Sequence, residues 1–289
     1  MFPVPVLDFS DDSDNFDELP QMHIAPHVLN DVDSQICQEV GLKILTPIRC
    51  TENSTVYNAE SLNDNLMWAV KITEHKKQVQ EEYEKRKNLP DSPYLVKTIA
   101  LYTTPTKAIL QMELCEEGDI QNMYFEETSI WYILHDIAEA LYHLHSNGWM
   151  HLDVSPGNIL STENTYKLAD FGTLMRIGTF EEGCEGAGPY CSPETLSFPS
   201  GPPVGPSTDI FSFGIVLFEA ASHQRAPRGG CDGYVKIRSG TIKLGSSGYP
   251  CDMSEELITL INQMISQDPK DRPTIEDILM HPRVQNPCL

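Results

Sequence analysis

Three side chains in two neighbouring segments suit the chemistry of phosphate transfer. The stretch "HLDVSPGNIL" (151–160) places Asp153 five positions before Asn158, and "LADFGT" (168–173) follows about a dozen residues later with Asp170. In this chemistry one carboxylate orients a hydroxyl and accepts its proton, whereas an amide oxygen and a second carboxylate bind Mg²⁺. The order and spacing predict Asp153 as the catalytic base and Asn158 and Asp170 as metal ligands.

A lysine earlier in the chain fits the same chemistry. Lys71 lies in "WAVKI" (68–72), a run typical of a strand, and an acidic helical segment follows it. A lysine in this position can hold nucleotide phosphates and pair with a glutamate of that helix. Glu82 is the first candidate for the partner, by its distance from the next strand, and Glu81 remains an alternative.

The elements that must position these residues divide the chain into two parts. From about 40 to 115 the pattern is that of strands, with "STVYNAE" (54–60) and "MWAVKIT" (67–73) joined by the hairpin signal "SLNDN" (61–65). A charged helix is expected over 74–89, with Glu81/Lys85 and Glu82/Arg86 as i,i+4 pairs on its surface. Two more strands are expected over 94–104 and 108–114.

The second part has the periodicity of helices. Four are expected, over 129–148, 207–222, 254–265 and 274–282. The second begins with "STD", typical of capping, and is apolar almost all round, as a buried helix is. Glu194 in "CSPETL" and Arg272 in "DPKDRPT" are expected to form a buried ion pair. The fold class is therefore α+β and bilobal, with a small β-rich lobe containing one helix (39–115) and a larger, mostly helical lobe (116–289).

Composition restricts the partners. The chain has 289 residues and a formal net charge of -22, and residues 1–38 read as an acidic tail that is disordered alone. Because nucleic acids and anionic membranes are polyanions, neither is an expected partner. We expect neither a signal peptide nor a membrane helix, and no zinc-type cysteine spacing. These features predict a soluble nuclear or cytoplasmic monomer.

These motifs together resemble the eukaryotic protein kinase family over about 40–285. The resemblance implies one kinase domain over 39–285 that uses ATP and Mg²⁺, with Lys71 and Glu82 as an ion pair. It implies Met112 as the gatekeeper beside the nucleotide and Glu113 and Cys115 as hinge residues that contact adenine through their backbone. Further nucleotide contacts are expected from Val56, Ala69 and Leu160.

A narrower resemblance is to the Wee/Myt kinases. It rests on "HLDV" in place of H-R-D, on "EGAGPYCSPETL" (185–196) and on "PRGGCDGYVKIRSGTI" (227–242). The resemblance implies inhibitory phosphorylation of a tyrosine or threonine of a cyclin-dependent kinase, bound to its cyclin, and a negative role in mitotic or meiotic entry. Leu152 stands where most kinases have an arginine that binds an activation-segment phosphate, which implies an active form without that phosphate.

The sequence departs from the kinase pattern in three places. Arg49, Thr51 and Ser54 stand where the phosphate-binding loop has glycines, so Arg49 or Thr51 are expected to contact phosphate themselves. Ser155 replaces the usual lysine, and Gly157 supplies no cation either. Ala187 and Pro189 replace the acidic and basic residues of a segment near the substrate. These losses favour, as an alternative, an inactive pseudokinase that serves as a binding module, and a small-molecule kinase is a third hypothesis.

Overall fold

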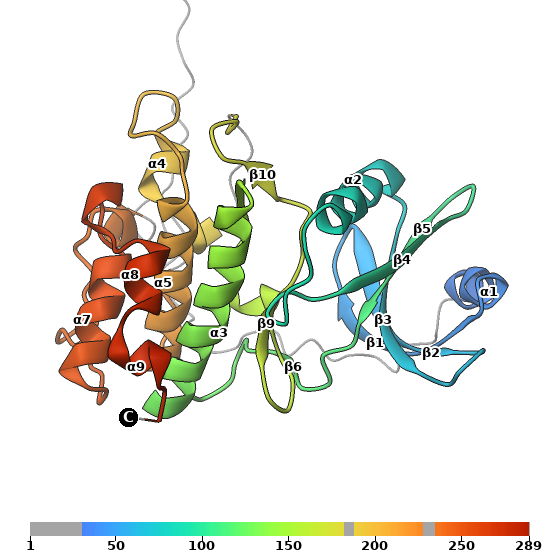
Figure 1. The fold of residues 1–289 in the computed structure, drawn as a ribbon, viewed down its shortest axis with the longest axis horizontal. Coiled ribbons are helices and arrows are strands. Elements are labelled where there is room, and N and C mark those ends of the chain that lie inside the picture. Colours follow the sequence, from blue (N-terminus) through green and yellow to red (C-terminus); the bar gives the residue numbers. More distant parts are fainter. Residues whose placement is uncertain (1–30, 182–187, 228–234, 289) are drawn as a thin grey trace, which may run out of the picture.

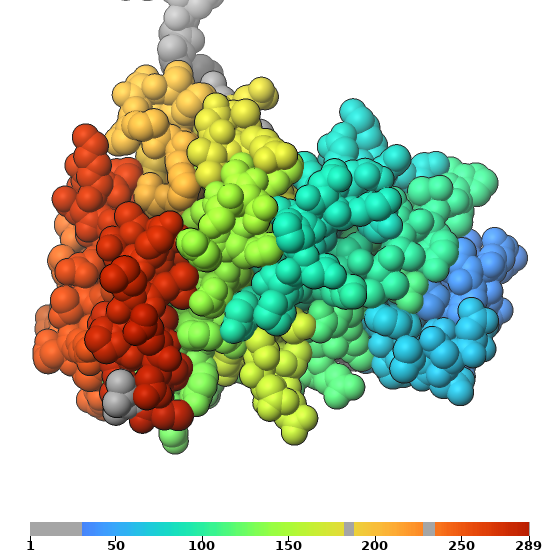
Figure 2. Space-filling view, in the orientation of Figure 1, coloured from blue at the N-terminus to red at the C-terminus, as the bar shows by residue number. Residues whose placement is uncertain are grey.

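The computed structural model describes residues 31–181, 188–227 and 235–288. It has two lobes, a smaller one around a sheet and a larger helical one, and it confirms the predicted α+β fold (Figure 1). Figure 2 shows the C-terminal lobe, in lime green to red, beside the blue to green N-terminal lobe. Of the helices in these described ranges, none combines the length and apolar character that crossing a bilayer requires.

The N-terminal lobe is built on one antiparallel sheet with the strand order β1-β2-β3-β5-β4. Its elements are α1 (Asp31–Glu39), β1 (Leu42–Cys50), β2 (Ser54–Ser61), β3 (Met67–Thr73), α2 (Lys76–Lys87), β4 (Thr98–Thr103) and β5 (Ala108–Glu113). Alternation along β3 places Val70 and Ile72 in the apolar cluster shared with α1. It turns Lys71 to the other face, where α2 lies. The predicted hairpin between β2 and β3 is present.

Helix α1 corrects the predicted tail. Residues 31–38 were expected to be disordered, yet they belong to a helix whose Cys37 is fully buried against the sheet. Asp33 is also buried, and it accepts hydrogen bonds from Tyr57 Oη (3.1 Å) and Lys107 Nζ (2.7 Å). The sheet therefore supplies the partners that an isolated acidic segment lacks. Residues 1–30 of the predicted tail lie outside the described residues.

Asp33→Ala is expected to lower the free energy of unfolding by about 1–3 kcal/mol, because it leaves the Tyr57 hydroxyl and Lys107 without their acceptor. Denaturant titration would measure the loss. Asp31→Ala, on the exposed side of the same helix, serves as the control and should change little. Equal stability of the two variants would show that the Asp33 contacts do not attach α1 to the sheet.

The C-terminal lobe surrounds α3 and α5. Its strands are β6 (Gly118–Asp119), β7 (Trp149–Met150), β8 (Ile159–Ser161), β9 (Tyr166–Leu168) and β10 (Met175–Arg176), and its helices are α3 (Glu127–Ser146), α4 (Pro193–Leu196), α5 (Ser207–Ser222), α7 (Glu255–Met264), α8 (Ile275–Leu279) and α9 (Pro282–Gln285). Helix α5 is buried on almost every side. A Cβ at Gly214 would lie 2.8 Å from Met264 Cβ, so glycine permits α7 to pack this closely.

Two expectations for helix ends were wrong. The "STD" residues do not cap α5, since its N-cap is Pro206 and makes no side-chain bond. Thr208 instead donates to Glu194, and Asp209 binds the loop before Asn158. The helix expected over 274–282 stops at Leu279, and α9 starts at Pro282, because proline lacks the N–H that would continue the first helix.

Candidate active site

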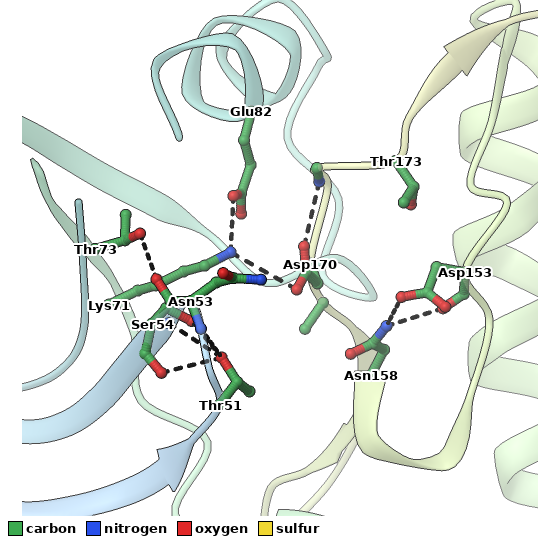
Figure 3. Close-up of polar contacts among 12 residues, drawn as sticks. Thr51, Asn53, Ser54, Lys71, Thr73, Glu82, Asp153, Asn158, Asp170 and Thr173 are labelled. Atoms are coloured by element: carbon green, nitrogen blue, oxygen red, sulfur yellow. Dashed lines mark hydrogen bonds and ion pairs between the residues drawn. The ribbon is translucent and has the colours of Figure 1, made fainter. Parts of the chain in front are cut away.

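Lys71 links the two lobes at the back of the cleft. Its Nζ lies 2.8 Å from Glu82 Oε2 of α2 and 3.7 Å from Asp170 Oδ2 of the C-terminal lobe (Figure 3). Of the two glutamates that the sequence left open, the structure pairs Glu82 with Lys71. Glu81 instead lies 3.8 Å from Lys77 on the exposed side of α2.

The same geometry corrects the expected surface pair between Glu82 and Arg86. Both side chains are buried. Glu82 faces Lys71. Arg86 Nε instead donates to Val96 O at 3.2 Å, and the Arg86 guanidinium lies over the Phe171 ring. Tertiary partners therefore override the i,i+4 spacing that surface helices use.

The charges of this cluster favour a divalent cation. Burial raises the pKa of Glu82, and it opposes the charged form of Lys71, but Asp170 and Glu82 outweigh that effect and raise the pKa of Lys71. Burial alone would raise the pKa of Asp170, whereas Lys71 and the Gly172 N–H hold it below its ordinary value. The single positive charge of Lys71 lies between the carboxylates of Glu82 and Asp170, so these three groups together carry an excess negative charge. The Asp170 side chain, 41% exposed to the cleft, can therefore hold Mg²⁺.

The loop 151–158 is held by hydrogen bonds at both ends. Asn158 Nδ2 donates to the backbone oxygen of Asp153 at 2.9 Å and to its Oδ2 at 2.8 Å (Figure 3). At the other end, Asp209 accepts from the backbone N–H groups of His151 (2.9 Å) and Leu152 (2.8 Å). These bonds fix the loop with Leu152 in a left-handed conformation at φ 65° and position the Asp153 carboxylate.

Asp209 is a supporting residue whose role the sequence indicated only in part. Burial alone would raise its pKa, but His145, whose Nε2 lies 2.8 Å away, and the loop N–H groups outweigh burial and lower the pKa. The side chain therefore stays ionised inside the protein. The sequence analysis placed it in the "STD" run at the start of α5, but that run did not reveal the loop that it holds.

The loop between β1 and β2 is closed by its own side chains rather than by glycines. Thr51 Oγ1 accepts from Ser54 N at 3.1 Å and donates to Ser54 O, also at 3.1 Å. Thr73 Oγ1 donates to Asn53 O at 2.6 Å, which ties the loop to β3. Figure 3 shows these residues gathered beside Lys71. The Thr51 hydroxyl, expected from the sequence to contact phosphate, is committed to this turn.

A cavity of about 490 Å³ lies between the lobes. The residues that the sequence assigned to nucleotide and metal all line it: Arg49, Thr51, Val56, Ala69, Lys71, Glu82, Met112, Glu113, Cys115, Asn158, Leu160 and Asp170. Asp153 adjoins it through its bonds to Asn158. The Glu113 side chain turns away to Lys167 and to Lys97 N.

Several lining residues were missed by the sequence analysis. Ile48 and Ala169 add apolar surface, and Asp119 and Thr173 add polar groups. Ala169 precedes Asp170 in "LADFGT", and Asp119 lies just after the division expected between the two lobes at residues 115 and 116, so position relative to these features was the available signal. Thr173 Oγ1 donates to His151 O at 2.8 Å and thus joins two motifs.

Comparisons with known proteins agree with this geometry. The chain matches the protein kinase domain model over residues 51–284. It is 33% identical over 239 residues to the membrane-associated tyrosine- and threonine-specific cdc2-inhibitory kinase wee-1.3 of Caenorhabditis briggsae, covering 78% of this chain and 35% of that protein. It is 29% identical to the Drosophila melanogaster kinase of the corresponding description, covering 80% of this chain and 44% of that protein.

A yeast relative extends the same pattern. The mitosis inhibitor protein kinase wee1 of Schizosaccharomyces pombe is 31% identical over 199 residues, which cover 59% of this chain and 22% of that protein. The chain spans about a third of the length of the nematode relatives it matches. The matched domain shows that the chain belongs to the protein kinase family and that it resembles the Wee-type members of that family.

Proposed function

We propose that the protein is an ATP- and Mg²⁺-dependent kinase that phosphorylates a tyrosine or threonine of a cyclin-dependent kinase and so delays mitotic or meiotic entry. The observation that carries this proposal is the convergence of Lys71, Glu82, Asp170, Asn158 and Asp153 on one cleft. The names of the similar nematode and fly proteins, which are cdc2-inhibitory kinases, support the substrate class, and the name of the yeast protein, a mitosis inhibitor kinase, supports the role in mitotic entry.

The roles of the residues follow from their positions. Bound MgATP supplies the phosphoryl group and a partly neutralised phosphate chain. Lys71, held by Glu82, contacts the phosphates, and Asp170 binds the metal. Asp153 orients the substrate hydroxyl and takes up its proton, while Asn158 fixes the carboxylate through the bond to Oδ2. The backbone at Met112, Glu113 and Cys115 borders the space for adenine.

An apolar cluster supports activity without an activation-segment phosphate. Leu152 is 4% exposed and packs with Met150, Phe180 and Val204. Phe180 belongs to the segment that follows Gly172, whereas Met150 and Val204 come before and after that segment. An apolar contact therefore holds this segment where other kinases use an arginine and a phosphate. Ala187, one of the two departures near the substrate, lies outside the described residues, and Pro189 is the second residue of their next range, 188–227.

The second candidate function is that of a pseudokinase acting as a binding module. The closed turn at Thr51–Ser54 and the serine at position 155 favour it, because both remove contacts that transfer uses. Thermal shift distinguishes the two. Ligand binding to the native state alone raises stability, so magnesium-dependent stabilisation by ATP counts against a module that binds no nucleotide.

Mass spectrometry of a cyclin-dependent kinase–cyclin complex, incubated with this protein, ATP and Mg²⁺, tests the proposed function. We expect a new phosphate on a tyrosine or threonine of the phosphate-binding loop of the cyclin-dependent kinase. A catalytically dead cyclin-dependent kinase as substrate excludes autophosphorylation, and omission of ATP serves as the control. Absence of any phosphate above that control would reject the proposal.

A further inference from the structure

Arg49 reaches across the cleft from the N-terminal lobe. Its Nη1 donates to Gly157 O at 2.9 Å and approaches Asn158 Oδ1 at 3.4 Å, and these partners lie 108 and 109 residues further along the chain. Arg49 stands in β1 at a position where the family has a glycine. The structure therefore places a fixed positive charge over the loop that holds Asp153.

Gly157 provides the space for this guanidinium. A Cβ at position 157 would lie 3.3 Å and 3.4 Å from the two terminal nitrogens of Arg49. Gly157 does not adopt a left-handed conformation, so its small size rather than its backbone freedom matters here. A Cβ at this position would push the guanidinium aside by a few tenths of an ångström.

The Asn158 side-chain amide faces Arg49 with its oxygen and Asp153 with its nitrogen. Its Nδ2 is occupied by two bonds to Asp153, which leaves Oδ1 as the atom for a cation. That oxygen faces Arg49 Nη1, whereas Asp170 keeps a partly exposed carboxylate in the cavity. Within the described residues no cluster of three or more acidic, histidine or cysteine side chains offers another metal site. The residues present thus fit a metal at Asp170 and an arginine at Asn158.

We propose that the Arg49 guanidinium takes the place of a metal ion at Asn158 and binds the nucleotide phosphates there, so that the chain needs one divalent ion, at Asp170. Guanidinium suits this role because it is always charged and binds phosphate through several N–H groups. It also supplies a cation near the reaction that Ser155 does not. The inference rests on the nucleotide binding of the proposed function.

Isothermal titration with AMP-PNP, a non-hydrolysable ATP analogue, tests this assignment. In EDTA the native protein is expected to bind AMP-PNP, and Arg49→Ala to weaken that binding by about 10- to 100-fold, as loss of a charged hydrogen bond does. Arg49→Lys should retain part of the affinity. Lys43→Ala is the control, because Lys43 lies on the same strand but pairs with Glu60 at 3.7 Å on the surface.

Electron paramagnetic resonance gives a second readout by counting the Mn²⁺ ions bound with saturating AMP-PNP. We expect one ion in the native protein and a second in Arg49→Ala, where Asn158 Oδ1 becomes accessible. Two ions in the native protein, or metal-free affinity that does not depend on Arg49, would overturn the inference. Lack of any AMP-PNP binding would overturn it together with the proposed function.

Phosphate transfer separates the two claims. If the native protein transfers no phosphate yet binds AMP-PNP through Arg49, the proposed function fails and the inference stands. If it transfers phosphate and Arg49→Ala binds the metal-free analogue as tightly as the native protein, the inference alone fails.

Discussion

Asp153→Asn is expected to lower the rate of phosphate transfer by about 10²- to 10⁴-fold, the range typical of losing a general base. An asparagine at this position can still accept the hydrogen bond that Asn158 Nδ2 now donates to Asp153 Oδ2, so the loop should keep its shape. The amide cannot take up the proton of the substrate hydroxyl. The loss should therefore fall on the chemical step, and the affinity for MgATP should stay unchanged.

Initial rates with a cyclin-dependent kinase substrate, alongside calorimetric titration with MgATP, provide this test. Asp252→Asn is the matched control, because Asp252 is exposed and does not line the cleft. If Asp153→Asn transfers phosphate at the native rate, Asp153 is not the base. If the variant loses MgATP binding as well, the residue supports the structure of the nucleotide site instead.

The fold and most of the cleft could be predicted because local patterns carry them. Lys71 follows from an apolar strand and an acidic helix, and Asp153, Asn158 and Asp170 lie within 18 residues of one another. Helix α5 was predictable over its full length, since a continuous apolar run has few alternatives. Such features depend on residues that lie close together in the chain, so a local pattern is enough to predict them.

The remaining features depend on partners that are distant in the chain. The contact of Arg49 with Gly157 joins the two lobes, so neither segment alone reveals it. Asp33 belongs to an acidic stretch that looks solvated until Tyr57 and Lys107 surround it. Thr208 is of a residue type that often caps helices, yet its hydroxyl donates to Glu194 in the folded protein. In each case a tertiary hydrogen bond outweighs the local preference.

Arg272→Met is expected to reduce the free energy of unfolding by about 3–5 kcal/mol, the largest loss of stability among the substitutions considered. Arg272 Nη1 and Nη2 lie 2.6 Å and 2.9 Å from the two Glu194 carboxylate oxygens, and neither side chain has exposed surface. The predicted pair is therefore present. Its loss leaves a buried carboxylate to which Thr208 Oγ1 still donates a hydrogen bond.

The loss of stability in Arg272→Met should depend on pH, because the substitution changes the pKa of Glu194. Burial alone would raise the pKa of Glu194, but Arg272 outweighs burial and lowers it. A lowered folded-state pKa contributes stability that is complete above the ordinary glutamate range and is lost as the pH falls through the folded-state value. Arg272→Met removes the strongest effect that opposes burial, so we expect the pKa of Glu194 to rise and acid to favour the folded variant. The difference between the two proteins should therefore narrow as the pH falls from the raised folded-state value of the variant towards the ordinary glutamate pKa of about 4.3.

Two further variants separate charge from packing at this site. Lys77→Met removes an exposed pair with Glu81 and should cost less than about 1 kcal/mol. The double variant Glu194→Leu/Arg272→Met leaves no buried charge, so it should be more stable than Arg272→Met alone. Urea titrations between pH 4 and 7 measure the free energy of unfolding of the native protein and of each variant. This range includes the ordinary glutamate pKa and neutral pH. If Arg272→Met loses as much stability in acid as at neutral pH, the loss comes from packing against Phe211, whose ring centre lies 4.9 Å from Arg272 Cζ, and not from the uncompensated charge of Glu194.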